Sequence, residues 1–201
     1  MKTNYQLQTD GITAALGGET PRLLLQSCCG PCSSYVLEYL TRYFDVTILY
    51  YNPNIQPREE YDKRLHYQRE VLRHIPAGIM ECDYDPGAFE EAARGYEDAP
   101  EGGERCSRCF LLRLEKTAQL AREQGFDYFC TTLTVSPHKD AERINSIGFA
   151  LEEKYGVKWL PSDFKKRNGY LRSIELAKQY GLYRQDWCGC LYSKQDSGPK
   201  D

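Results

Sequence analysis

An alternation of short apolar runs and longer amphipathic segments constrains the fold of this 201-residue chain more than any other feature. Strand-like runs are expected at residues 22–26, 46–51, 78–82, 127–132 and 157–160. Helix-like segments are expected between and after them, at residues 32–43, 58–75, 86–94, 107–124, 138–155 and 169–180. Strands that alternate with helices form a parallel sheet covered on both faces, and right-handed crossovers then favour a doubly wound arrangement. The predicted fold is a single α/β domain, Rossmann-like (HUP-type), with a mostly parallel sheet.

The ends of the chain differ in composition from its middle. Residues 1–20 are polar and Gly-rich and lack an apolar signal core, so we expect a flexible N-terminal leader, followed by one domain over residues 21–192 and a polar tail over residues 193–201. No apolar run approaches the ~18–20 residues that span a bilayer, so the predicted location is cytoplasmic, with no membrane partner. The net charge of −3 means that a nucleic-acid partner would need a local basic face.

Nine cysteines are the second unusual feature of the sequence. Lasting disulfides are rare in the cytoplasm, so clustered thiols there indicate metal or redox chemistry. Cys82 and Cys130 stand alone in strand-like runs, and we expect both in the core. The other seven form three groups: Cys28, Cys29 and Cys32 in "CCGPC", Cys106 and Cys109 in "RCSRC", and Cys188 and Cys190 in "WCGC".

The first group, in "QSCCGPCSS", lies between the first predicted strand and the first predicted helix of the sheet. In doubly wound sheets this turn borders the ligand crevice, and in nucleotide-binding proteins it cradles phosphate. The glycine fingerprint of such loops is missing here, and thiols stand in its place. The sequence therefore predicts a ligand pocket at the usual place in the sheet, but one that binds something other than a nucleotide phosphate.

The second group places Cys106 and Cys109 on one face at or just before a helix N-terminus, next to three arginines that favour thiolates. A pair of half-buried structural cysteines is the alternative. The wide separation from "CCGPC" is poor zinc-ribbon spacing, yet it suits an iron–sulfur cluster assembled by tertiary structure. We therefore expect a [4Fe-4S] cluster on Cys28, Cys29, Cys106 and Cys109, with a separate, additional iron left open.

The third group has one glycine between its two thiols. A disulfide between Cys188 and Cys190 would close a small, strained ring, and strained disulfides are oxidising and labile. The pair is therefore predicted to be redox-active and catalytic. A second metal half-site is the alternative. Cys32 is left over, as an additional metal or active-site residue.

Two polar segments border the predicted site. "TTLTVSPHK" follows the fourth strand, where Pro137 is expected to open a helix capped by Ser136; this end can bind an anion or simply be capped, and His138 is an additional active-site candidate. The basic stretch that leads into "DWCGC" interleaves cations with tyrosines, a pattern that grips phosphates and stacks bases. A solvated helix face is the alternative. The cations of this stretch that we single out as nucleic-acid-binding candidates are Lys165, Lys166, Arg167, Arg172 and Arg184.

Five motifs in order, "CCGPC", "YNPNIQPREEY", "RCSRCFLLRL", "TTLTVSPHK" and "FKKRNGYLRSIELAKQYGLYRQDWCGC", resemble the epoxyqueuosine reductases of the QueH type over about residues 23–190. The resemblance implies the last step of queuosine synthesis, in which epoxyqueuosine at the wobble position of tRNAs with G-U-N anticodons is reduced to queuosine with loss of water. It also implies an iron–sulfur, cobalamin-independent enzyme and an electron donor that the sequence does not identify.

The resemblance assigns roles by motif. Cys28, Cys29, Cys106 and Cys109 match cluster ligands, and the cysteines of "WCGC" match the redox-active pair. The chain departs from the family at Cys32, where some members carry Asp. That departure leaves open whether Cys32 binds iron, replaces one of the four ligands or lies beside them.

Two other functions fit parts of the same pattern. A tRNA-thiolating iron–sulfur enzyme of the same fold would need an S-G-G-x-D-S-type loop after the first strand, and this chain has "SCCGPCS" there. A non-enzymatic zinc-binding RNA module would be colourless, whereas an iron–sulfur protein is brown.

Overall fold

The computed structural model describes residues 3–196, and it confirms the α/β class. One parallel sheet has the strand order β3-β2-β1-β4-β5. The order reverses between β1 and β4, so the crevice at the carboxyl ends of these two strands is where a doubly wound sheet binds its ligand. The strands are β1 (Arg22–Gln26), β2 (Asp45–Tyr50), β3 (Gly78–Glu81), β4 (Tyr128–Thr131) and β5 (Lys158–Trp159).

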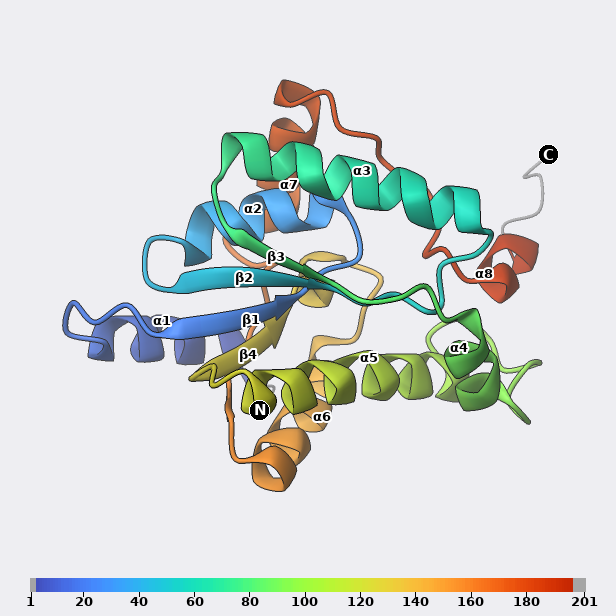
Figure 1. Ribbon diagram of the computed structural model, residues 1–201, viewed down its shortest axis with the longest axis horizontal. Helices are drawn as coiled ribbons and strands as arrows, with labels where there is room; N and C mark the ends of the chain where they lie inside the picture. Colours follow the sequence, from blue (N-terminus) through green and yellow to red (C-terminus); the bar gives the residue numbers. More distant parts are fainter. Residues whose placement is uncertain (1–2, 197–201) are drawn as a thin grey trace.

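Helices cover both faces of the sheet (Figure 1). One face packs against α2, α3 and α7, together with residues of α1, and the other packs against α5 and α6. The short helices α4 and α8 lie beyond the carboxyl ends of the strands (Figure 1). The helices are α1 (Tyr5–Ala15), α2 (Gly30–Leu40), α3 (Arg58–His74), α4 (Pro86–Ala93), α5 (Glu104–Glu123), the 3-10 turn η1 (Leu133–Val135), α6 (Ala141–Tyr155), α7 (Gly169–Gln179) and α8 (Leu191–Asp196).

The central strand β1 is buried on both faces, which explains the run of three leucines in its sequence. Leu23 and Leu25 join the core under α2, whereas Leu24 joins the core under α5, and all three are 0 % exposed. Successive side chains of a strand point to opposite faces, so a strand buried on both sides has no solvent-facing positions. This burial fixes the register of β1 and therefore the place of the cysteine loop that follows it.

Two helix starts differ from the sequence prediction. Helix α5 begins at Glu104, so Cys106 and Cys109 lie inside its first two turns. Helix α6 begins at Ala141, because the Asp140 carboxylate accepts hydrogen bonds from the next two free backbone amides, at 3.0 and 3.2 Å. The expected helix opening at Pro137 with a Ser136 cap was therefore wrong.

The N-terminal segment also differs from the expected flexible leader. Residues Tyr5–Ala15 form helix α1, whose buried side chains are polar. The Thr9 hydroxyl is 0 % exposed and donates to the Pro161 carbonyl oxygen at 2.6 Å, and the Tyr39 hydroxyl donates to Asp10 at 3.0 Å. These hydrogen bonds dock the segment on the domain, because a buried polar group needs a partner.

The predicted polar tail begins inside a helix. Helix α8 runs to Asp196, and Ser193 is buried with its hydroxyl donating to the Cys190 carbonyl oxygen at 3.1 Å. Residues 197–201 of the predicted tail lie outside the described residues. Within residues 3–196, none of the helices has both the length and the apolar character that crossing a bilayer requires.

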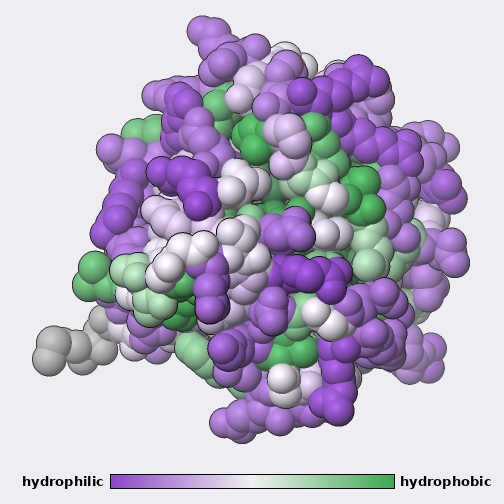
Figure 2. Space-filling view, turned by 60° about the vertical axis from the view of Figure 1, so that its left-hand side comes forward, coloured by the Kyte–Doolittle hydropathy of each residue, from purple (hydrophilic) through white to green (hydrophobic). Residues whose placement is uncertain are grey.

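Hydrophilic residues dominate the outer surface on the side shown in Figure 2, and hydrophobic residues show between them, mainly above and to the right of the centre. This distribution agrees with helices that bury one face on the sheet and expose the other.

Candidate functional site

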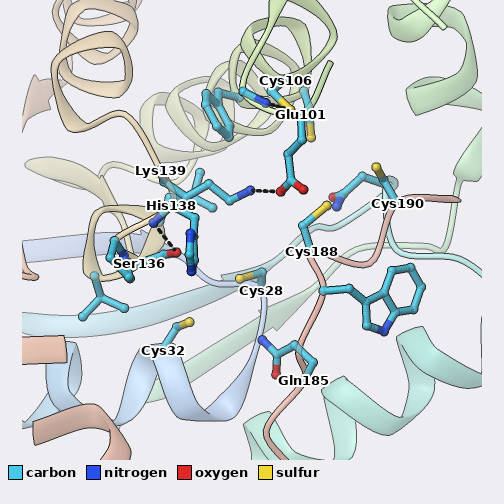
Figure 3. Close-up of a pocket in the computed structure, with 18 of the residues that line it drawn as sticks. Cys28, Cys32, Glu101, Cys106, Ser136, His138, Lys139, Gln185, Cys188 and Cys190 are labelled. Carbon is cyan, nitrogen blue, oxygen red and sulfur yellow. Dashed lines mark hydrogen bonds and ion pairs between the residues drawn. The ribbon is translucent and has the colours of Figure 1, made fainter. Parts of the chain in front are cut away.

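A cavity of about 980 Å³ lies at the carboxyl ends of the strands. Its wall includes residues that follow β1, β2 and β4, the start of α5, and the segment that leads into α8. Figure 3 shows sulfur atoms from three separate parts of the chain around this space. The cysteines that line the cavity are Cys28, Cys32, Cys106, Cys109, Cys188 and Cys190.

The first cysteine group forms a compact set of thiols. The Sγ atoms of Cys28, Cys29 and Cys32 all lie within 4.8 Å of one another, and those of Cys28 and Cys29 are 3.9 Å apart. Gly30 permits this loop to press against α3, because a Cβ there would lie 2.5 Å from the Tyr67 carbonyl oxygen. The geometry therefore brings Cys32, the residue left unassigned by spacing, into the same group as the two predicted ligands.

Proximity separates the pKa values of these three thiols. Hydrogen bonds from Cys29 and Cys32 hold the pKa of Cys28 well below its usual range. The same contact with Cys28 raises the pKa of Cys29 to about 12 and raises the pKa of Cys32. The group thus stabilises one thiolate by two neighbouring S–H donors, the form in which cysteine binds a metal.

The second group lies on one face of α5, as the spacing predicts. Cys106 and Cys109 are each 8 % exposed. The Gly102 amide donates to Cys106 Sγ at 3.3 Å, and burial raises the pKa of Cys109 to about 11. Among the described residues, these two sulfurs are not part of the set that lies within 4.8 Å, so the four-cysteine ligand set stays a prediction.

The third group is held by helix α3. Arg64, which is 1 % exposed, donates to the carbonyl oxygens of Cys188 at 3.1 Å and Trp187 at 3.3 Å. A hydrogen bond from Cys190 lowers the pKa of Cys188 to about 5, aided by the nearby Lys139 and the Ser193 hydroxyl. The pKa of Cys190 rises correspondingly. An acidic thiol beside a neutral one is the arrangement of a reactive dithiol.

The rim of the cavity carries ionisable groups. Lys139 reaches Glu101 across the opening, with Nζ and Oε1 3.5 Å apart, and His138 stands beside Ser136 (Figure 3). Burial disfavours the charged form of Lys139, yet the negative charges around it, that of Cys188 foremost, outweigh this effect and raise the Lys139 pKa. His138, an additional active-site candidate from the sequence, lines the cavity as expected.

The predicted tRNA-binding cations divide into two kinds. Lys165 pairs with Asp163, Arg167 with Asp10, and Arg172 with Glu38 and Glu175, so three of them are already paired with acids of this chain. Lys166 is exposed, and Arg184 is exposed at the cavity wall. The structure therefore brings only Arg184 of this set to the site.

Several residues of the cavity could not have been identified from the sequence alone. Asn54 is 2 % exposed with Oδ1 lacking a hydrogen-bond partner within the described residues, and Gln185 Oε1 is likewise buried and unpartnered there. Glu101 comes from the loop between α4 and α5. Arg64 comes from α3, whose sequence carries charged residues along its whole length, so that nothing in it marks Arg64 as buried. Each of these residues reaches the cavity through tertiary packing, which cannot be predicted from the spacing of motifs along the sequence.

The fold and the cavity together define a doubly wound α/β protein with a thiol-lined pocket at the switch point of its sheet. The sequence profile described as Epoxyqueuosine reductase QueH matches residues 23–196. The chain therefore belongs to the QueH family of epoxyqueuosine reductases, which are oxidoreductases, and the resemblance seen in the sequence is confirmed.

Curated relatives carry the same family name. The protein from Streptococcus pyogenes serotype M1 is 46% identical over 184 residues, which cover 89% of this chain and 72% of that one. The protein from Staphylococcus epidermidis is 44% identical over 189 residues, which cover 90% and 79%. Among solved structures, the U34-tRNA thiolase NcsA from Methanococcus maripaludis with its [4Fe-4S] cluster has a similar fold, with a TM-score of 0.56, 14% identity, and coverage of 93% of this chain and 67% of that one.

Proposed function

We propose that this protein reduces epoxyqueuosine in tRNA to queuosine, with an iron–sulfur cluster bound by cavity cysteines and with Cys188 and Cys190 as a redox-active pair. The observation that carries the proposal is the meeting of three cysteine groups from distant parts of the sequence around one cavity. At about 980 Å³, the cavity has room for a nucleoside. The target base would leave the anticodon stack to enter it, as in other enzymes that act on a nucleobase.

The donor set fits an iron–sulfur cluster. Soft thiolates are the ligands that such clusters take, and three sulfurs already lie within 4.8 Å of one another. The guanidinium nitrogen Nε of Arg113 is buried on the cavity wall and has no hydrogen-bond partner within the described residues, as expected beside a group that carries negative charge. We assign Cys28, Cys29, Cys106 and Cys109 as ligands. Cys32, in the same sulfur group, is then placed to bind an additional iron.

The reaction converts an epoxide, two electrons and two protons into an alkene and water. A bound cluster would supply electrons one at a time, whereas Cys188, as a thiolate, and Cys190, as a thiol, can supply two electrons and one proton as they become a disulfide; the second proton must come from another group. Lys139 and His138 line the same cavity and are positioned to deliver a proton to the departing oxygen. An electron donor of unidentified nature would then restore the dithiol.

The remaining parts of the assignment concern the partner. Arg184 at the cavity wall and the exposed Lys166 of the same basic stretch would contact phosphates of the anticodon arm. The G-U-N anticodon follows from the family assignment and the cytoplasmic location from the sequence, and both stay predictions.

The test uses protein purified without oxygen. We would record its visible spectrum, count iron and sulfide, add reductant and tRNA carrying epoxyqueuosine, and follow queuosine by mass spectrometry. Brown protein with about four irons and four sulfides, together with queuosine formation, supports the proposal. Cys28→Ser should lose iron, whereas Cys82→Ser, at a half-buried thiol outside the cavity, should keep it.

Two results would redirect the assignment. Colourless, zinc-containing protein without turnover would indicate an RNA-binding module, and a thiolated nucleoside as product would indicate the thiolase activity. Full turnover by Cys188→Ser would remove the dithiol from the mechanism and leave the cluster as the electron source.

A further inference from the structure

Arg113 occupies an unusual position in the wall of the cavity. It lies on α5 one turn after Cys109 and is only 3 % exposed. Its Nη2 donates to Asn52 Oδ1 at 2.9 Å, while Nε has no hydrogen-bond partner within the described residues. Burial disfavours the charged form of Arg113, yet attraction to the sulfurs of Cys109 and Cys28, which line the same cavity, outweighs this effect and raises the Arg113 pKa. Arg113 therefore connects two cysteine groups that are far apart in the sequence.

Among the side chains that the structure describes, no carboxylate forms an ion pair with Arg113. Of the two other buried arginines that line the cavity, Arg64 pairs with Glu60 at 2.6 Å, and Arg105 donates to the carbonyl oxygens of Glu97 and Ala99. Burying a cation without an anion is strongly unfavourable, since the lost hydration is not replaced. Among the described residues, the groups whose negative charge attracts Arg113 are Cys109 and Cys28, which line the same cavity. The position thus requires an anionic sulfur site beside it.

The surrounding contacts hold Arg113 rigidly in place. Asn52 accepts from Arg113 with the same oxygen that accepts from Gln26 at 3.1 Å, and its amide donates to the Ser27 carbonyl oxygen at 2.8 Å. Gln26 is the last residue of the central strand β1, and Ser27 links it to Cys28. The guanidinium is therefore fixed to the end of β1 and does not need to reorganise when the charge at the sulfurs changes.

We propose that Arg113 is the built-in counter-charge of the sulfur site and that it raises the reduction potential of the cluster bound there. The inference rests on the proposed iron–sulfur function. Adding an electron makes the cluster more negative, and a fixed positive charge in a low-dielectric wall stabilises the more negative state. Arg113 is a positioning residue in this role, because it acts on the electron carrier and not on the substrate.

The test measures the midpoint potential of the cluster by anaerobic dye titration in the loaded protein. Arg113→Met should disfavour reduction at least tenfold, which is about 59 mV for one electron. Arg113→Lys keeps the charge and should stay within threefold of the unchanged protein. Arg105→Met is the comparison variant. Arg105 is an equally buried arginine of the same helix and also lines the cavity, but its guanidinium donates to the carbonyl oxygens of Glu97 and Ala99, so Arg105→Met should shift the potential less than Arg113→Met does.

Each outcome decides the inference. An Arg113→Met protein that loads iron and keeps the wild-type potential overturns it. If Arg113→Met does not load iron, normal loading by Arg113→Lys supports the counter-charge, and failure of both while Arg105→Met loads shows that the shape of the guanidinium matters and not its charge. Iron-free unchanged protein refutes the proposed function itself, and the inference with it.

Discussion

Replacing Gly189 by alanine tests whether the backbone between the two C-terminal thiols is fixed by its surroundings. Gly189 has a φ of +102°, which an L-residue adopts at a cost of about 1–2 kcal/mol. A Cβ there would also lie 3.0 Å from Arg64 Nη1 and 3.0 Å from Ile55 Cγ1. Both neighbours are essentially fully buried, so neither can move freely, and overpacking of this kind costs about 1–3 kcal/mol.

The two contributions together predict a loss of about 3 kcal/mol in the free energy of unfolding. For a chain of this length that loss lowers Tm by about 6–12 °C. Part of the strain is relieved by moving the loop away from Arg64, which displaces Cys188 and Cys190. We therefore expect turnover of epoxyqueuosine tRNA to fall at least tenfold as well.

The matched control is Gly181→Ala. Gly181 has a φ of +62°, and no atom lies within 4 Å of the position that a Cβ would take there, so this variant isolates the backbone cost from the contact cost. It should lose about 1 kcal/mol, a Tm shift of about 2–4 °C, and keep full turnover. Thermal unfolding and initial rates measured on both variants decide the matter. Equal losses of Tm and of turnover in the two variants would show that the Arg64 contact does not fix the loop.

Three further predictions follow from the same structure. Gly148→Ala should cost about 3 kcal/mol in urea unfolding, because its Cβ would lie 2.2 Å from a buried indole, and an unchanged midpoint would contradict this. Alkylation of Cys188, followed by mass spectrometry, should stay fast down to about pH 5 and slow below it as the thiolate is protonated; Cys190→Ser should move that fall to higher pH. Arg184→Ala should weaken tRNA binding and reduce its salt slope by about 1, whereas Arg172→Ala, which breaks surface ion pairs, should change stability by under about 1 kcal/mol and leave the slope unchanged.

The sheet was predictable because its strands are buried on both faces. The predicted run 22–26 coincides with β1, and the other four predicted strands overlap the observed ones. The last strand shortens to Lys158–Trp159, because pairing with β4 covers only two residues. Helix α1 could not be recognised in the same way, since the side chains it buries are Gln6, Thr9 and Thr13. Polar side chains that are buried through hydrogen bonds look, in a sequence, like side chains that face water.

The sequence predicted which cysteines take part in the candidate site, but it did not predict the distances between them. Sequence spacing identifies which cysteines share a loop or a helix face, and all three groups indeed border the cavity. It does not give distances between groups, because those depend on how α5 and the C-terminal segment pack on the sheet. The close approach of Cys32 to Cys28 and Cys29 therefore became visible only in three dimensions.

The arginines show which sequence patterns predict a role at the site and which do not. A count of cations in residues 163–184 predicts a basic face, yet three of its members are paired with acids that come from elsewhere in the fold or from the same segment. Arg113 carries a more specific signal, because it falls on the stripe of α5 that also holds Cys106, Cys109 and Thr117, at intervals of three and four residues. Residues with this spacing lie on one face of a helix, here the face turned to the core. A cation on such a face must be balanced by a nearby anion, and cysteines on the same face are the groups that can supply it.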